Sequence, residues 1–332
     1  MDKHQDKHQV QHRDKQHVVI VADCDHPSIE IEQAVLKDTC PEIRWLACRT
    51  EDEVIAQCQD GEGILIQYAP MTRRVLEQLP RCRIIARYGV GVDTVDLLAA
   101  SDLGIVVSNV PDYGTNEVSD HALAMMLCLT RKIPMANTQI KRGQWDFRLM
   151  HPVHRHQVQT IGIIGLGRIG RAMAHKTHAL GMKVVGYDPY LNPANLPDYI
   201  TLTSLDDLLR QSDVVSVHCP LTDVTRNMLD ESMLGLMKPS AYLVNTARGC
   251  IVDEVALDRL LTDKKLAGAA MDVLAVEPGP LTHPLFKHEN FYCTPHMAWH
   301  SEESAQELKR KAAEETRRVL RGEAPMYQVN KF

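Results

Sequence analysis

The chain has 332 residues, 44% of them hydrophobic, and a formal net charge of −6. This length and apolar content suit two domains, each with its own hydrophobic core. The acidic balance, with a pI near 6.2, offers no basic surface for nucleic acid. The chain opens on polar residues without a signal peptide, and its apolar helical run at 122–129 is too short for a membrane span. We therefore expect neither a nucleic-acid nor a membrane partner.

The cysteines and histidines predict no metal site. Nine cysteines without a Cys-x-x-Cys pair indicate free thiols in a reducing cytoplasm. Residues 1–17 form a polar arm with four histidines, and its lack of apolar residues favours a disordered arm over a metal site. Three more histidines, at 151, 154 and 156, have no acidic companions and predict a solvated loop.

Five apolar stretches alternate with amphipathic segments between residues 18 and 109. We expect strands at 18–22, 43–47, 63–67, 84–88 and 105–108, which makes a flavodoxin-like parallel sheet covered on both faces. After the fourth strand, Gly89 and Gly91 flank Val90 in a glycine-rich turn. The bared amides of such a turn can hold a carboxylate, and a purely structural turn fits the residues equally well.

A break at 111–115 separates this region from a long helix. The helix is expected over 117–132, with Thr115 or Asn116 as its cap. We place the first crossover between the two domains at this break.

The stretch Thr160–Gly170 runs from an apolar strand into a glycine-rich turn and a helix. Gly165, Gly167 and Gly170 stand at the spacing Gly-x-Gly-x-x-Gly, which permits a tight turn, a close approach of pyrophosphate and close helix packing. Asp188 ends the next strand, 23 positions after Gly165, where a carboxylate can bind ribose hydroxyls and repel a 2'-phosphate. The pattern predicts NAD rather than NADP. The alternative is a helix-packing loop with an incidental aspartate.

Strands are expected again at 214–219, 242–246, 269–273 and 291–294, and ligands gather at the carboxyl ends of such strands. Arg248, Glu277 and His296 follow strands in this half of the chain. Arg248 can hold a carboxylate or carbonyl oxygen, His296 can transfer a proton, and Glu277 can orient the imidazole. This trio suits reduction of a 2-oxo acid, while three ordinary loop residues would show the same spacing.

The sequence resembles the D-isomer-specific 2-hydroxyacid dehydrogenases. The likeness rests on Gly165–Gly170, on Asn245-Thr-Ala-Arg-Gly-Cys-Ile-Val-Asp-Glu254, on Asp272 with Glu277-Pro278, and on Thr294-Pro-His-Met-Ala-Trp299. Within that family the chain looks similar to the branch of the C-terminal binding proteins. The resemblance implies two doubly wound parallel-sheet α/β domains. One is a discontinuous flavodoxin-like substrate-binding domain at 18–115 and 301–332, and the other is a Rossmann NAD-binding domain at 116–300.

The resemblance also implies roles for individual residues. Arg248 would bind substrate, His296 would be the acid/base with Glu277 as its partner, and the Val90 and Gly91 amides would hold the substrate carboxylate. Trp299 and Tyr113 are candidate walls of the substrate pocket, and plain packing explains them nearly as well. The predicted cofactor-binding residues are Gly165, Gly167, Arg168, Ile169, Gly170, Asp188, Cys219, Pro220, Thr225, Thr246, Ala247, Asp272 and His296.

The predicted protein is a cytoplasmic NAD-dependent D-2-hydroxyacid dehydrogenase, a homodimer through its NAD-binding domain, acting on a small 2-oxo or 2-hydroxy acid. One alternative is an NAD(H)-sensing scaffold or corepressor like the C-terminal binding proteins, although no regulatory tail follows Gly322. Another alternative is a 3-phosphoglycerate dehydrogenase. The sequence shows no added C-terminal regulatory domain and no obvious basic cluster for a phosphate, which argues against this alternative.

Overall fold

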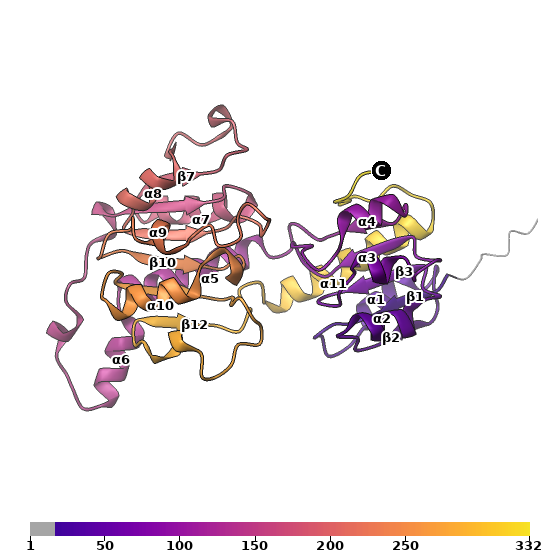
Figure 1. Cartoon of the computed structure of the whole chain (residues 1–332), viewed down its shortest axis with the longest axis horizontal. Helices are drawn as coiled ribbons and strands as arrows, with labels where there is room; N and C mark the ends of the chain where they lie inside the picture. Colours follow the sequence, from indigo (N-terminus) through magenta and orange to yellow (C-terminus); the bar gives the residue numbers. More distant parts are fainter. Residues whose placement is uncertain (1–16) are drawn as a thin grey trace, which may run out of the picture. The chain divides into compact units, whose positions relative to one another are not determined.

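The computed structural model describes residues 17–332, so the prediction of a disordered arm at 1–17 concerns residues that, apart from His17, lie outside the described part. The chain forms two compact units. The first unit comprises the residues up to Tyr113 together with Ala305–Phe332, and the second is Gly114–Ser304 (Figure 1). The functions assigned to these two units from the sequence stay predictions.

The sheet of the first unit has five parallel strands in the order β2-β1-β3-β4-β5. Its central strands are short runs of β-branched and aliphatic residues that are buried on both faces, as a sheet covered by helices requires. The order is that of flavodoxin-like folds, as predicted. The strands are β1 (Val19–Val21), β2 (Ile43–Trp45), β3 (Gly63–Ile66), β4 (Ile84–Arg87) and β5 (Val106–Ser108).

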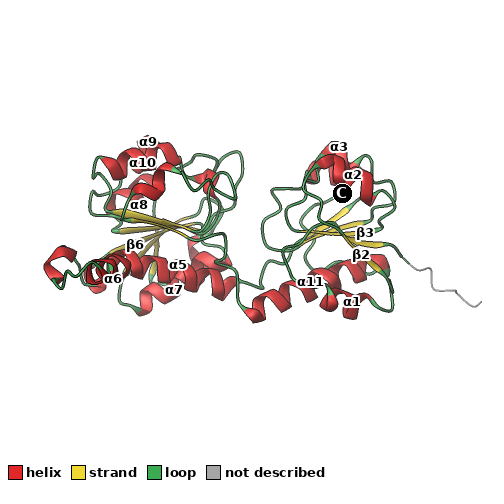
Figure 2. Ribbon diagram, turned by 90° about the horizontal axis from the view of Figure 1, so that it is seen from below, coloured by secondary structure: helices red, strands yellow, loops and turns green. Residues whose placement is uncertain are grey.

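Helices cover both faces of this sheet, with α2 and α3 on one side and α1 and α11 on the other (Figure 2). The helices of the first unit are α1 (Glu30–Leu36), α2 (Glu51–Cys58), α3 (Arg73–Leu76), α4 (Leu97–Asp102) and most of α11 (Glu302–Leu320). Thr50 caps α2 through a capping box with Glu53. Arg83 binds the last carbonyls of α11, donating to Val319 at 2.8 Å and Leu320 at 3.1 Å, so the end of the chain completes the first unit.

The sheet of the second unit has seven parallel strands in the order β12-β11-β10-β9-β6-β7-β8. The strand order reverses between β6 and β9, as it does in the Rossmann fold, and ligands bind at the carboxyl ends beside such a reversal. The strands are β6 (Thr160–Ile164), β7 (Lys183–Tyr187), β8 (Ile200–Leu202), β9 (Val214–Val217), β10 (Tyr242–Asn245), β11 (Gly268–Met271) and β12 (Phe291–Cys293).

Two helical layers bury the two faces of the second sheet (Figure 2). On one face, Ala122 and Met126 of α5 pack with Met173 of α7 against β6 and β10. On the other face, α8, α9 and α10 cover a second apolar cluster. The helices are α5 (Thr115–Thr130), α6 (Ile133–Lys141), α7 (Arg168–Ala179), α8 (Leu205–Gln211), α9 (Glu231–Leu234) and α10 (Glu254–Thr262).

The structure confirms two parallel-sheet α/β domains and changes details of the expected elements. Most strands end one or two residues earlier than predicted. The edge strand β8 and the helix α6 were not expected from the sequence. Helix α5 begins at Thr115 with Gly114 as its N-cap, so neither Thr115 nor Asn116 caps it. No helix within residues 17–332 is long and apolar enough to cross a membrane.

Candidate active site

The geometry of the turn after β6 requires glycine at two of its three glycine positions and leaves open space at the third. Gly165 adopts φ +88°, and a Cβ there would lie 2.6 Å from the Cys219 nitrogen. A Cβ on Gly170 would lie 1.9 Å from the Gly165 carbonyl oxygen, so only glycine permits α7 to approach β6 this closely. A Cβ on Gly167 would meet no atom within 4 Å, and this residue is exposed. Open space at Gly167 therefore fits a ligand that approaches the main chain.

Helix α7 begins directly after this turn, with Gly167 as its N-cap. Arg168 and Ile169 are its first residues, and the amides of a first helical turn have no acceptor within the helix. The positive end of the helix dipole adds to this preference for anions. This helix end can hold a phosphate group.

Asp188 lies just after β7 and is tied to the same turn. Its Oδ2 accepts a hydrogen bond from the Leu166 amide at 2.9 Å, and its Oδ1 accepts one from the Tyr190 amide at 3.0 Å. These bonds fix the carboxylate beside the glycine turn and leave further lone pairs for a ligand. The arrangement fits the prediction that Asp188 binds ribose hydroxyls.

The structure brings His296 and Glu277 together. The His296 Nδ1 atom lies 2.5 Å from Glu277 Oε2, and both side chains are about one-third exposed or less. The other carboxylate oxygen of Glu277 accepts the Leu274 amide at 2.9 Å. A carboxylate at Nδ1 keeps a hydrogen on that nitrogen, so Nε2 is the atom that can give or take a proton.

His296 stands on a loop that Asp272 holds in place. The Asp272 side chain is 1% exposed. Its Oδ1 accepts hydrogen bonds from the Thr294 hydroxyl at 2.5 Å and the Met297 amide at 3.0 Å, and its Oδ2 accepts the Ala298 amide at 2.8 Å. The Asp272 carbonyl oxygen also accepts the His296 amide at 2.8 Å. His296 itself has φ +53°, a left-handed conformation that these surrounding bonds maintain.

Arg248 follows β10 at the same edge of the sheet. Its guanidinium donates to the Ala247 carbonyl at 2.8 Å, and the Arg248 carbonyl accepts the Asn245 side-chain amide at 2.9 Å. Asn245 is fully buried, and its Oδ1 accepts the Ala247 amide at 3.0 Å. The buried Asn245 thus shapes the turn that presents Arg248. The carboxyl ends of β10 and β12 therefore supply a planar cation and an imidazole.

Two buried polar atoms lie at the carboxyl ends of β9 and β10, beside the reversal of strand order. Thr246 Oγ1 and His218 Nδ1 are buried and have no hydrogen-bond partner among the described residues. Asn245 of β10 pairs with Val217 of β9, so Thr246 and His218 follow on adjacent strands at the same level. Buried polar groups normally have partners, so these two atoms fit a polar ligand group at this edge. Thr246 was predicted from the sequence, whereas His218 was missed.

Burial sets the protonation of the neighbouring groups. Burial lowers the pKa of His218 to about 4, so this imidazole is neutral at neutral pH, and its Nε2 lies 2.8 Å from Ser216 Oγ. Burial raises the pKa of the Cys219 thiol to about 11, which makes it a neutral lining group rather than a nucleophile. Beyond them, the Thr225 hydroxyl donates to the Pro220 carbonyl at 2.7 Å and closes the exposed turn after β9.

The predicted substrate residues of the first unit lie at the carboxyl end of β4. The Val90 carbonyl accepts the Asn109 side-chain amide at 2.6 Å, and Val90 is 40% exposed. The amides of Val90 and Gly91 donate to no other described residue, which leaves them for a carboxylate. Tyr113, at the end of the first unit, is 8% exposed.

Trp299 belongs to the second unit. It packs edge-on against His300, with ring centroids 5.3 Å apart, and its carbonyl accepts the Ser304 hydroxyl at 2.7 Å. Its role as a pocket wall stays a prediction. No group of three or more metal-ligating side chains occurs within residues 17–332.

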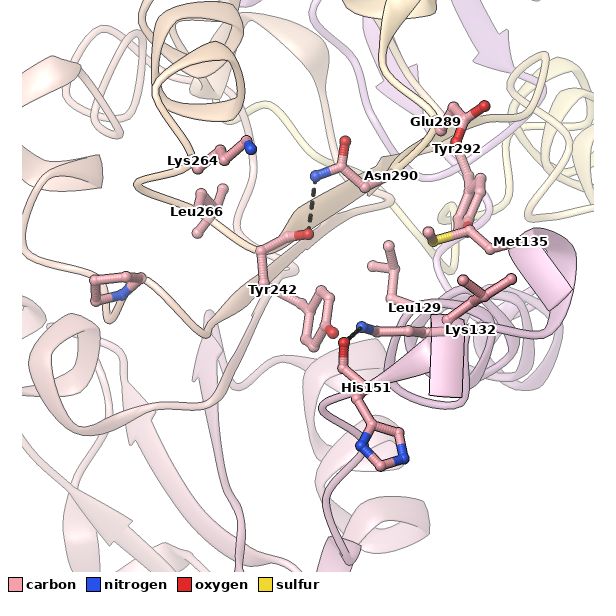
Figure 3. Close-up of a pocket in the computed structure, with 13 residues that line it drawn as sticks. Leu129, Lys132, Met135, His151, Tyr242, Lys264, Leu266, Glu289, Asn290 and Tyr292 are labelled. Carbon is pink, nitrogen blue, oxygen red and sulfur yellow. Dashed lines mark hydrogen bonds between the residues drawn. The ribbon is translucent and has the colours of Figure 1, made fainter. Parts of the chain in front are cut away.

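A cavity of about 480 Å³ lies at the opposite edge of the second sheet, and it is not part of this site. Tyr242 opens β10 there, Asn290 precedes β12, and Lys132 reaches the His151 carbonyl oxygen at 3.4 Å (Figure 3). Leu129 and Leu266 supply apolar lining. The arrangement holds no acid/base pair like that of His296 and Glu277.

Comparison with known proteins places the chain in a family. The model of the D-isomer specific 2-hydroxyacid dehydrogenase NAD-binding domain matches residues 123–298. A glyoxylate reductase of Thermofilum pendens is 35% identical over 311 residues, covering 90% of this chain and 91% of that protein. The solved D-lactate dehydrogenase of Aquifex aeolicus, complexed with NAD and lactic acid, has a TM-score of 0.82 at 28% identity and covers 92% of this chain and 96% of its own.

A D-3-phosphoglycerate dehydrogenase of Methanocaldococcus jannaschii is 36% identical over 285 residues, or 85% of this chain. The chain spans 54% of the length of that relative and 58% of the corresponding enzyme of Mycobacterium tuberculosis. These likenesses reach far beyond the glycine turn into both units. The chain belongs to the family of D-isomer-specific 2-hydroxyacid dehydrogenases.

Proposed function

We propose that this protein is an NAD-dependent dehydrogenase that interconverts a 2-oxo acid and its D-2-hydroxy acid, with His296 as the acid/base. The 2.5 Å contact between His296 Nδ1 and Glu277 Oε2 carries the proposal, because it leaves Nε2 as a single proton-transfer atom at the ligand edge of the sheet. The family of the chain and the open space beside the main chain at Gly167 support NAD as the cofactor.

Each of the site residues has a separate role in the proposed reaction. NAD(H), when bound, supplies or accepts the hydride. In the reducing direction, His296 donates a proton from Nε2 to the substrate oxygen while Glu277 stabilises the imidazolium through Nδ1. Arg248 holds the carboxylate or carbonyl oxygen with its planar fork. The free amides of Val90 and Gly91 bind the substrate carboxylate.

The first test is oxidation of NADH with a panel of 2-oxo acids, among them glyoxylate, pyruvate, hydroxypyruvate and 3-phosphohydroxypyruvate. We expect turnover of at least one acid. His296→Gln should lower turnover by about 10²–10⁴-fold and leave NADH binding unchanged. Exposed His175, on α7, provides the matched control His175→Gln, which should behave as the wild type. Unchanged turnover in His296→Gln contradicts the assignment.

The same experiment also distinguishes two alternative functions. Several relatives are D-3-phosphoglycerate dehydrogenases, so marked preference for 3-phosphohydroxypyruvate would assign the narrower activity. Tight NADH binding without turnover of any acid would favour a scaffold that senses NAD(H), like the C-terminal binding proteins. Such a scaffold needs a specific peptide partner, which a pull-down with the NADH-loaded protein would retain.

We further propose that the protein is a homodimer through its NAD-binding domain. The segment from α6 to β6 exposes large apolar side chains, with Trp145 87% exposed, Phe147 76% and Val158 75%. Exposed apolar side chains gathered on one segment are typical of an interface. The cavity at the amino ends of β10 and β12 borders this segment through Leu149 and His151, and Figure 3 shows His151 there. Light scattering of the wild type and of Trp145→Ser tests this, since a monomeric wild type contradicts it.

The cysteines support a reducing compartment such as the cytoplasm. All nine are free thiols, and four of them are buried. Fractionation of cells that express the full chain would test this location.

A further inference from the structure

Helix α5 presents two polar side chains, one turn apart, to the loop that carries His296. The Glu117 Oε1 atom accepts a hydrogen bond from the Ser301 hydroxyl at 3.0 Å. The His121 Nε2 atom lies 2.9 Å from Thr294 Oγ1. Residues four apart share one face of a helix, so α5 fixes both ends of the segment 294–301.

The hydrogen atoms of this cluster can be assigned from its partners. The Asp272 carboxylate accepts the Thr294 hydroxyl hydrogen at 2.5 Å, and a hydroxyl has only one hydrogen to give. Thr294 Oγ1 therefore meets His121 with a lone pair, and His121 Nε2 is the donor. His121 Nε2 also lies 3.7 Å from Asp272 Oδ1. The side chain of His121 is 21% exposed and that of Asp272 is 1% exposed, so water competes little for these bonds.

The cluster continues to the acid/base. Asp272 binds the Met297 and Ala298 amides through its side chain and the His296 amide through its carbonyl. His296 is thereby kept at φ +53°, with its Nδ1 2.5 Å from Glu277 Oε2. A left-handed histidine persists only where its surroundings impose that conformation. One continuous set of hydrogen bonds thus leads from α5 to the imidazole.

We propose that His121 is a positioning residue for the acid/base. Its hydrogen bond to Thr294 locks Thr294 onto Asp272, and Asp272 then holds the loop in the one conformation that keeps His296 against Glu277. His121 acts through these two residues and not on the reacting atoms. The inference rests on the proposed function, because positioning affects turnover only if His296 transfers the proton.

The test compares variants that remove or retain the donor. His121→Phe keeps a ring and loses the hydrogen bond, whereas His121→Gln places an amide nitrogen near the position of Nε2. We expect His121→Phe to lower kcat about tenfold, since small misplacement of a reacting group costs up to about 10²-fold, and to leave the Kd for NADH unchanged. The kinetic isotope effect with 4-deuterated NADH should rise, because chemistry becomes slower than product release. His121→Gln should recover most of the activity.

A double-mutant cycle separates this role from plain packing of α5. Thr294→Val keeps the shape of the side chain and removes the hydroxyl that bonds both His121 and Asp272. If His121 acts only through Thr294, the double variant loses no more activity than Thr294→Val alone. Additive losses, an undiminished kcat in His121→Phe, or a His121→Gln variant no better than His121→Phe would each overturn the proposal. Should His121→Phe fail to fold, Thr294→Val still removes the hydroxyl that links His121 to Asp272, and an undiminished kcat in that variant would overturn the proposal.

Hydrogen exchange supplies a readout that needs no substrate. Amides of residues 294–301 should exchange about tenfold faster in His121→Phe than in the wild type, while α10 keeps its protection. Equal exchange in that segment would overturn the proposal. If the wild type reduces no 2-oxo acid, the proposed function fails, and the exchange experiment still decides whether His121 holds the loop.

Discussion

The open space at Gly167 predicts that a substitution there weakens cofactor binding without destabilising the fold. Gly167 has φ −68°, a conformation open to any residue, and a Cβ there would meet no atom within 4 Å. Gly167→Ala therefore introduces no clash within the protein. Replacing glycine at a compatible position lowers the entropy of the unfolded chain, so the free energy of unfolding should stay the same or rise by about 0.4–1 kcal/mol.

The same methyl group fills the space that a bound pyrophosphate would use. We expect the Kd for NADH to rise at least about tenfold, which corresponds to about 1.4 kcal/mol. At an NADH concentration of about 100 times the wild-type Kd, bound NADH stabilises the wild type by about 2.7 kcal/mol but the variant by only about 1.4 kcal/mol. The rise in Tm on adding NADH should then be roughly 3–5 °C smaller in the variant.

Gly170→Ala is the matched comparison. Its Cβ would lie 1.9 Å from the Gly165 carbonyl oxygen, so backbone must shift and the fold should lose about 1–3 kcal/mol even without ligand. Thermal unfolding with and without NADH, together with calorimetric titration, separates the two variants. A Gly167→Ala protein that binds NADH with the wild-type Kd would refute the placement of the cofactor at this turn. A Gly170→Ala protein with the wild-type Tm would refute the packing argument.

Three further changes test the electrostatics. Asp188→Ser should raise the kcat/KM for NADPH relative to NADH, because a carboxylate repels a 2'-phosphate; an unchanged ratio would count against that role. The buried His218, with its pKa lowered to about 4, binds its proton only when the protein unfolds between about pH 6.5 and pH 4. The free energy of unfolding should therefore fall as the pH drops through that window. In urea titrations, the free energy of unfolding of the His218→Gln variant should fall less over the same range. Lys309→Met should cost about 3–5 kcal/mol in urea unfolding, because it leaves the buried Glu32, 3.6 Å from Lys309 Nζ, without its cation; a smaller loss would mean that Glu32 is neutral.

The strands of both sheets could be predicted because their signal is local. Runs such as Ile84–Arg87 are apolar, short and bounded by turn residues, and the expected strand at 84–88 differs from the observed one by a single residue. The edge strand Ile200–Leu202 was missed because it has three residues, only one of them buried. Helix α6 escaped notice because none of its residues is buried, so no apolar face marks it.

Among the site residues, too, those with a local sequence signal could be predicted and those that depend on distant contacts could not. The glycine turn was predicted because glycine spacing follows from local geometry, and Arg248 and His296 were predicted because each follows a strand in a parallel sheet. His121 was missed because its partner Thr294 lies 173 positions away in the sequence. From the sequence alone, a histidine on the inner side of a helix is taken for an ordinary core residue. Only the folded chain shows the hydrogen bond to the Thr294 hydroxyl.

Asp272 shows why one residue can have both a predicted role and an unforeseen one. The family resemblance implies a contact between Asp272 and the cofactor, and the structure adds the hydrogen bonds that hold the His296 loop. A carboxylate offers about four acceptor positions, and the Thr294 hydroxyl with the Met297 and Ala298 amides occupies three. One position remains for a donor group of the cofactor. The same side chain would then join cofactor binding to the placement of the acid/base.

This double role predicts a distinct result for Asp272→Asn. An amide has only one acceptor atom, so its NH₂ group would face a main-chain N–H of the loop and leave a buried donor unsatisfied, at a cost of about 1–3 kcal/mol. Turnover and NADH affinity should both fall, whereas His121→Phe lowers turnover alone. Steady-state kinetics and NADH titration of the two variants make the comparison. Weaker NADH binding with wild-type kcat would limit Asp272 to the cofactor, and lower kcat with unchanged NADH binding would limit it to the loop.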